Sequence, residues 1–213
     1  PRFKRAHCTV LFSATLSPFH YYRDLLGLPE HSVWREVASP FVAQQLEVHV
    51  RSEISTRYHQ RTASVPPIVA TLAAHYQHKP GHYLAFFSSF AYLEQVMNAF
   101  EQAHPEIPVF GQTRGMQEPE REAFLARFAP GGKGIGFAVL GGAFAEGIDL
   151  PGERLIGAFV ATLGLPPFND FNEALKARLQ ARFGRGDDYT YRIPGMIKVI
   201  QAAGRVIRSP DDE

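Results

Sequence analysis

The fold class follows from one stretch of sequence, Ile135-Gly136-Phe137-Ala138-Val139-Leu140, which runs into Gly141-Gly142-Ala143-Phe144-Ala145-Glu146-Gly147-Ile148-Asp149. The first six residues are apolar without alternation, which is typical of a strand buried on both faces. The glycines after Leu140 end the strand and predict a loop. A fully buried strand followed by such a loop favours a parallel sheet over a half-exposed antiparallel one.

The rest of the chain repeats this pattern of apolar strands and amphipathic helices. Buried strands are also expected at residues 82–87 and 155–163, with a short one at 108–110. The alternation of strands with helices predicts an α/β fold with a parallel sheet flanked by helices on both faces. Helices are expected at residues 19–26, 65–77, 90–102, 119–128, 171–183 and 194–208, and two further strands at 9–12 and 45–50.

Composition limits the class of protein. The chain has 213 residues with 45% hydrophobic side chains, which suits one packed α/β domain. No apolar run reaches the roughly 18 residues that a membrane span requires, so we expect no membrane contact. A single cysteine, Cys8, excludes an internal disulfide and an iron–sulfur cluster held by four cysteines of this chain. We therefore expect a cytoplasmic location, nucleoid-associated in a bacterium.

The last predicted helix carries the clearest chemical pattern. At 100° per residue, Gln201, Arg205 and Arg208 fall on one face. The apolar residues of this helix fall on another face, which we expect to dock on the sheet; they are Met196, Ile200, Ala203 and Ile207. Two guanidinium groups at this spacing can stabilise the charge of a transferring phosphoryl group. The alternative is a pair of solvated charges at a helix C-terminus.

The glycine loop after residue 140 is the second candidate. Gly141 and Gly142 allow backbone N–H groups to approach a phosphate or a nucleic-acid backbone. Glu146 and Asp149 can accept hydrogen bonds from a ribose, a metal-bound water or an arginine. The alternative is an ordinary strand-to-helix connection with turn glycines.

Hydroxyl side chains follow two of the predicted strands. Ser13 and Thr15 come after the first strand, and Ser88 and Ser89 come after the strand at 82–87. Hydroxyls at such positions can hold the phosphates of a nucleic-acid strand. They are also common helix caps, and from one motif alone the cap is the more frequent use.

Taken in order, these segments resemble the XPD/DinG branch of superfamily 2 helicases. Residues 13–18 are similar to motif III, 86–90 to motif IV, 146–149 to motif V and 201–208 to motif VI. The resemblance extends over nearly the whole chain. It implies that residues 1–18 end the first lobe or a linker, that 19–213 form the second RecA-like lobe, and that 168–188 are an inserted helical segment.

The resemblance also implies a nucleotide-facing role for motif VI. Arg205 and Arg208 would reach the γ-phosphate of ATP from the second lobe as arginine fingers, and Gln201 would lie beside them. Asp149 and Gly147 would contribute to the nucleotide side of the same cleft, with Glu146 nearby.

A second group of residues is implied to face single-stranded DNA. Ser88, Ser89 and the Gly141–Gly142 loop would touch the strand. Ser13 and Thr15 would couple the nucleotide state to the grip on DNA. The family moves 5′ to 3′, and many members carry an iron–sulfur domain in the first lobe.

What the sequence lacks is equally informative. It contains no G-x-x-x-x-G-K-[ST] and no Asp-Glu-Ala-His-like segment to hold Mg²⁺. In the family both belong to the first lobe, so ATP and Mg²⁺ are expected to bind mainly there, and we expect no metal site in this chain. The first lobe and single-stranded DNA are the expected partners, and the chain alone is expected to be inactive as a piece of a longer protein.

Two other readings remain open from the sequence. The chain could be a non-enzymatic nucleic-acid-binding or partner-docking module derived from a helicase lobe. In that case residues 168–188 are a candidate docking site, although a solvated helix lying on the sheet is the simpler interpretation. A metabolic nucleotide-binding enzyme would need a phosphate loop and a catalytic acid or base of its own, for which the sequence gives no pattern.

Overall fold

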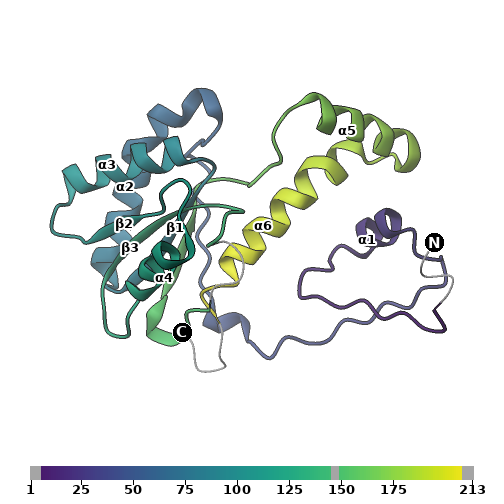
Figure 1. Cartoon of the computed structure of the whole chain (residues 1–213), viewed down its shortest axis with the longest axis horizontal. Helices are drawn as coiled ribbons and strands as arrows, with labels where there is room; N and C mark the ends of the chain where they lie inside the picture. The colour runs from purple at the N-terminus through teal and green to yellow at the C-terminus, as the bar shows by residue number, and fades with distance from the viewer. Residues whose placement is uncertain (1–5, 145–148, 208–213) are drawn as a thin grey trace.

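A computed structural model describes residues 6–144 and 149–207. At its centre lies a parallel sheet whose strands occur in the order β2-β3-β1-β4 (Figure 1). The strands are β1 (His82–Phe87), β2 (Val109–Gly111), β3 (Gly134–Val139) and β4 (Gly157–Val160). The predicted parallel α/β fold is therefore confirmed.

The central strand β1 shows why the sheet needs two protected faces. It pairs with β3 on one side and with β4 on the other, with Phe86 opposite Ala138 and opposite Val160. All six of its residues are buried. Successive side chains point to opposite faces, so a continuously apolar strand needs a cover on each side.

Helices α2 (Arg61–His78) and α3 (Phe90–Ala103) cover one face. Phe87 of β1 and Phe137 of β3 point toward these helices, and their rings stack with centroids 5.7 Å apart. Leu72 of α2 and Leu93 of α3 are almost completely buried against them. Helix α2 begins at Arg61, four residues before its expected start, so Pro66 and Pro67 lie within it.

Helices α4 (Glu118–Ala126) and α6 (Ile193–Ala203) cover the opposite face. There Leu84 and Phe86 of β1 join one cluster with Phe124, Phe128 and Ala202. The prediction that helices flank the sheet on both faces is confirmed (Figure 1).

The segment before α2 contains α1 (Phe19–Leu26) and two short 3₁₀ helices, Ala43–Gln45 and Tyr58–Gln60. The strands predicted at residues 9–12 and 45–50 are wrong, because neither segment has strand structure. Val10 is 76% exposed and Phe12 is 90% exposed. An apolar run becomes a strand only when a neighbouring strand supplies hydrogen bonds, and the described part of the chain pairs none with these segments.

Helix α5 (Asp170–Phe183) stands away from the sheet (Figure 1). It begins at an Asn169 cap that accepts a hydrogen bond from the Asn172 amide at 2.9 Å, and it ends at Gly184 in the left-handed conformation. A π-helical turn, Asp188–Arg192, then leads directly into α6. The expectation that this segment lies on the sheet is wrong, since α5 packs on the π-helical turn.

None of the helices within the described residues is both long enough and apolar enough to span a membrane.

Candidate nucleic-acid and nucleotide interface

The carboxyl ends of β1, β3 and β4 come together at one edge of the sheet. The Leu140 amide donates to the Phe87 carbonyl at 2.9 Å, and the Ala161 amide donates to the Phe86 carbonyl at 2.9 Å. Ser88 therefore lies between the loop that follows β3 and the loop that follows β4. Ligands of parallel sheets bind beyond this edge, so these loops form the candidate site.

Ser88 and Ser89 differ in what they do at this edge. Ser89 is the N-cap of α3, and its side chain accepts a hydrogen bond from the Tyr92 amide at 3.3 Å. The Ser88 hydroxyl is buried at the atom level and has no hydrogen-bond partner among the described residues. Ser89 thus has a structural role as a cap, while the Ser88 hydroxyl has no such internal role in the described structure.

The glycine loop after β3 is held by a residue that the sequence patterns did not reveal. Gln112, only 8% exposed, accepts a hydrogen bond from the Val139 amide at 2.9 Å. A Cβ on Gly142 would lie 3.0 Å from the Val139 carbonyl and 3.5 Å from the Gln112 amide nitrogen. Gly141 adopts φ +77°, which favours glycine. Gly141 is therefore favoured by its backbone conformation, and Gly142 by its close approach to the Val139 carbonyl.

Two apolar anchors, Phe144 and Leu150, border the segment that carries the predicted motif V acids. Phe144 is 1% exposed and packs on the Phe124 ring with centroids 4.3 Å apart, and Leu150 is 2% exposed. Asp149 is exposed directly before Leu150. Glu146 and Gly147 lie outside the described residues. The anchors hold Asp149 at the surface of a packed cluster rather than on a free loop.

Helix α6 crosses this edge on a face other than the predicted one. Met196 and Ile200 are each 51% exposed, so the prediction that they dock on the sheet is wrong. The buried residues are Gly195 and Ala202, seven positions apart and so on one stripe. A Cβ on Gly195 would lie 2.6 Å from the Leu163 carbonyl oxygen. Small side chains are used because the helix approaches the backbone too closely for larger ones.

Of the predicted motif VI residues, Gln201 lies within α6 and Arg205 lies beyond its end. Helix α6 ends at Ala203, and Gly204 is its C-cap. Arg205 lies in the turn that follows, where its amide donates to the Ala202 carbonyl at 3.2 Å. Gln201 is half-buried in the last helical turn, and Arg208 lies outside the described residues. The helix was expected to continue to residue 208, but residues 204–207 are not helical, so this prediction is wrong for them.

The end of α6 and the loop carrying Asp149 belong to one packing unit. Ala202 is completely buried in the same cluster as Phe144 and Leu150. Gln201 and Arg205 flank Ala202 at one and three positions, so the cluster fixes the backbone from which these side chains project. This brings two of the predicted nucleotide-facing segments together.

Ser13 and Thr15 are not part of this edge. The Thr15 amide donates to the Ser13 hydroxyl at 3.2 Å, and Tyr22 of α1 donates to the Thr15 carbonyl at 2.7 Å. In Figure 1 this segment and α1 lie beyond α6, on the side away from the sheet. The described chain therefore joins the predicted coupling residues to α1 and not to the loops of the sheet.

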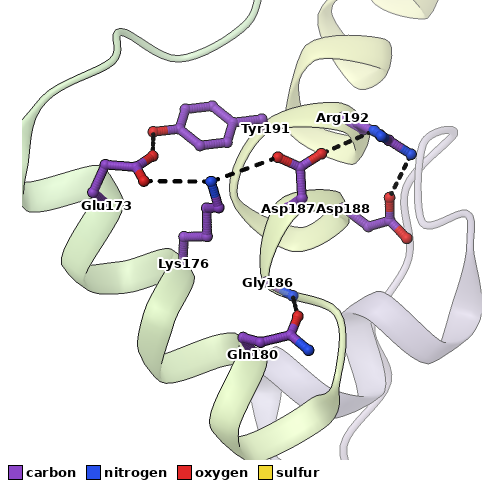
Figure 2. A network of polar contacts seen from close by, with 8 residues as sticks. All are labelled: Glu173, Lys176, Gln180, Gly186, Asp187, Asp188, Tyr191 and Arg192. Carbon is purple, nitrogen blue, oxygen red and sulfur yellow. Dashed lines mark hydrogen bonds and ion pairs between the residues drawn. The ribbon is translucent and has the colours of Figure 1, made fainter.

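A separate polar network ties α5 to the start of α6 (Figure 2). Tyr191 donates to Glu173 at 2.7 Å, and Lys176 lies 3.3 Å from Glu173 and 4.0 Å from Asp187. Hydrogen bonding from Tyr191, followed by that from Lys176, holds the pKa of Glu173 below its ordinary value. Burial, with the hydrogen bond to Glu173, raises the pKa of Tyr191 to about 12. At neutral pH Glu173 is thus a carboxylate and Tyr191 keeps the proton that it donates to it, and this contact joins α5 to the π-helical turn before α6.

Chemically, the site offers only part of what a nucleotide needs. Arg205 and Gln201 provide hydrogen-bond donors suited to phosphate oxygens. No three His, Cys, Asp or Glu side chains gather into a metal site within residues 6–144 and 149–207.

Comparison with known proteins places the chain among helicases. Residues 72–213 match the family described as the helicase C-terminal domain. The ATP-dependent DNA helicase XPD of Sulfolobus acidocaldarius is 23% identical over 213 residues, covering 96% of this chain and 37% of the relative. The general transcription and DNA repair factor IIH helicase subunit XPD of Dictyostelium discoideum is 26% identical over 235 residues, covering 100% of this chain and 29% of the relative.

Solved structures show the same fold. A structure described as an XPD helicase superimposes with a TM-score of 0.69 at 20% identity, covering 94% of this chain and 36% of the other. Xpd4 of S. tokodaii gives a TM-score of 0.55 at 21% identity over 75% of this chain and 30% of the other. The chain thus spans between 29% and 37% of the length of these proteins. Because the family match covers most of its residues, the chain belongs to the helicase C-terminal domain family.

Proposed function

We propose that this chain is the second motor lobe of an ATP-dependent DNA helicase that moves 5′ to 3′ on single-stranded DNA. In this role Arg205 and Arg208 act as arginine fingers on the γ-phosphate of ATP, with Gln201 beside them. Asp149, Gly147 and Glu146 contribute to the nucleotide side of the cleft. ATP and Mg²⁺ are held mainly by the first lobe, which is also where any iron–sulfur cluster of the intact protein lies.

One observation carries the nucleotide part of this proposal. Ala202 is fully buried in the cluster that also contains Phe144 and Leu150. Arg205 and Asp149 each lie close in sequence to a member of this cluster, Ala202 and Leu150 respectively, although 55 residues separate the two in sequence. Electrostatic stabilisation of a transition state depends on preorganised groups. A guanidinium that contacts a phosphate held by another lobe is therefore more effective when packed residues hold its backbone in place.

The DNA part rests on the carboxyl edge of the sheet. The Ser88 hydroxyl has no hydrogen-bond partner among the described residues, and Gly141, in the loop that follows the neighbouring strand, is exposed. Contacts of this kind bind phosphates without reading sequence. A motor that advances along any strand requires sequence-independent contacts, and Ser13 and Thr15 are proposed to couple them to the nucleotide state.

The division of labour implies that the chain alone does not hydrolyse ATP. Arginine fingers stabilise charge on a phosphoryl group that another element has bound and placed in line with its nucleophile. The sequence supplies no phosphate-binding loop of its own. Activity therefore belongs to the intact protein.

Direction of movement is tested with two partial duplexes that differ only in the polarity of their single-stranded tail. With the intact protein and ATP, we expect unwinding of the substrate with a 5′ tail and little unwinding of the substrate with a 3′ tail. Equal unwinding of both, or a preference for the 3′ tail, contradicts the proposed polarity.

A further inference from the structure

One lysine occupies a position on α6 where an apolar residue would be expected. Lys198 follows Gly195 by three residues and precedes Ala202 by four, so it lies on the stripe that docks on the sheet. Gly195 and Ala202 are both buried, and Lys198 is half-buried between them. Burying a lysine stem restricts a side chain with high conformational entropy, so the docked helix gains less from it than from an aliphatic residue.

The stem of Lys198 lies against two glycines of the candidate site. A Cβ on Gly141, after β3, would lie 3.4 Å from its Cδ and 3.5 Å from both its Cε and its Nζ. A Cβ on Gly164, after β4, would lie 3.3 Å from its Cβ and its Cδ. Both glycines have left-handed φ values, +77° and +60°. Lys198 therefore passes between the two loops, tightly against Gly164 and within van der Waals reach of Gly141.

This arrangement brings the ammonium group of Lys198 to the Gly141 loop at the carboxyl edge of the sheet. Lys176 on α5, by contrast, pairs with Glu173 at 3.3 Å. Within the described residues, no carboxylate lies within ion-pair distance of Lys198. Lys198 is half-buried and has no acidic partner in the part of the chain that the structure describes, so it is suited to an anionic ligand.

We propose that Lys198 binds a backbone phosphate of the single strand, in a cradle formed with the Gly141 and Gly164 loops and the Ser88 hydroxyl. Ser88 follows β1, which lies between β3 and β4 in the sheet, so it belongs to the same edge. The ammonium supplies the charge and Ser88 supplies a neutral donor. This inference rests on the proposed function, because it names the contact by which the lobe holds DNA.

The test uses the intact protein and measures the affinity for a single strand of mixed sequence as a function of salt. Each phosphate contact by a cation on single-stranded DNA adds about 0.7 to the slope of log K against log[salt]. Lys198→Met keeps the length and apolar character of the stem but removes the charge. We expect its slope to be shallower by about 0.7 and its affinity to be about tenfold lower. Lys198→Arg is expected to restore the slope.

Two further variants make the result specific. Lys133→Met removes the same charge at the start of β3, the opposite edge of the sheet, and should keep the wild-type slope. Ser88→Ala is expected to weaken binding with no change in slope, because it removes a neutral donor. Thermal unfolding of each variant reports whether the fold is retained.

The outcomes separate this inference from the proposed function. If wild-type protein binds single strands in a salt-dependent way and Lys198→Met has the same slope, the Lys198 contact is wrong while the motor assignment stands. A defect confined to the KM for ATP would place the lysine at a nucleotide phosphate and also overturn the DNA contact. If the wild-type protein shows no salt-dependent affinity for single strands, the DNA part of the proposed function itself fails.

Discussion

The hydroxyl of Tyr189 in the π-helical turn donates a 2.6 Å hydrogen bond to Oδ2 of Asp24 in α1, across 165 residues of sequence. Burial tends to raise the pKa of Asp24, but the hydrogen bonds from Tyr189 and Arg23 outweigh it and hold that pKa below its ordinary value. The rings of Tyr21 and Tyr189 also meet edge to face at 5.2 Å. These contacts join α1, and with it the segment that carries Ser13 and Thr15, to the π-helical turn directly before α6.

Replacing Tyr189 with Phe tests whether its hydrogen bond to Asp24 holds α1 in place. A hydrogen bond to a charged group is worth about 1.5–3 kcal/mol, and Arg23 still contacts Asp24 in the variant. We therefore expect hydrogen exchange of the α1 amides to accelerate by about tenfold. Tyr22→Phe, which removes a 2.7 Å bond to the neutral Thr15 carbonyl, should have a smaller effect. Equal protection of α1 in wild type and Tyr189→Phe would show that this bond does not hold α1.

Gly195→Ala tests how closely α6 approaches the sheet. The added methyl group would lie 2.6 Å from the Leu163 carbonyl oxygen and 2.8 Å from Leu165 Cδ2. Such overpacking costs about 1–3 kcal/mol, and it displaces the helix that carries Gln201. We expect a lower melting temperature of the intact protein together with a lower ATPase rate. Met196→Ala, on the exposed side of the same turn, is the control and should change neither quantity appreciably.

Stability should depend on pH through His82. Burial lowers the pKa of His82, and this outweighs the opposite effect of the nearby backbone of Ala129 and Gly134. Because the folded state disfavours the proton, stability is complete above the unfolded pKa of about 6.5 and falls as the pH drops below it, by at most about 1.4 kcal/mol per pH unit. Protection factors of the β1 amides between pH 7.5 and 5 measure this. In His82→Phe, whose ring can pack on Phe128 as the imidazole does, that pH dependence should be reduced.

The isolated chain should fail to hydrolyse ATP even when single-stranded DNA is present. The measurement is phosphate release by residues 1–213 compared with the intact protein at equal concentration. Circular dichroism of the same sample establishes that the α/β fold is present. Hydrolysis at a helicase-like rate would mean that this chain contains a complete nucleotide site, which contradicts the division between two lobes.

The core of the fold could be predicted because its signals are local. Strands β1 and β3 are apolar throughout, and turn residues such as Pro80 and Gly81 mark their ends. The predicted strand at residues 9–12 failed because its apolar pattern says nothing about a pairing partner. The path of α5 was also missed, since it depends on the Glu173–Tyr191 contact between two segments rather than on either sequence alone.

The sequence could predict which segments form the candidate site, but not how those segments pack against one another. The docked stripe of α6 was missed because Gly195 and Ala202 contribute little to a hydrophobic pattern, although they allow the closest approach. Gln112 was missed because its bond to the Val139 amide spans 27 residues. Lys198 was missed for a related reason, since only the folded chain brings it against Gly141. Close packing and long-range polar contacts are not encoded in periodicity.

The arginine fingers are the central claim, and ATP hydrolysis by the intact Arg205→Ala variant, with and without single-stranded DNA, tests them most directly. We predict that the DNA-stimulated rate falls by at least about 100-fold while ATP binding is largely kept, since such arginines are worth about 10³ to 10⁵ in rate. Arg208→Ala should behave similarly, whereas Arg178→Ala, on the exposed surface of α5, should match wild type. An Arg205→Ala variant with an undiminished DNA-stimulated rate would contradict the account.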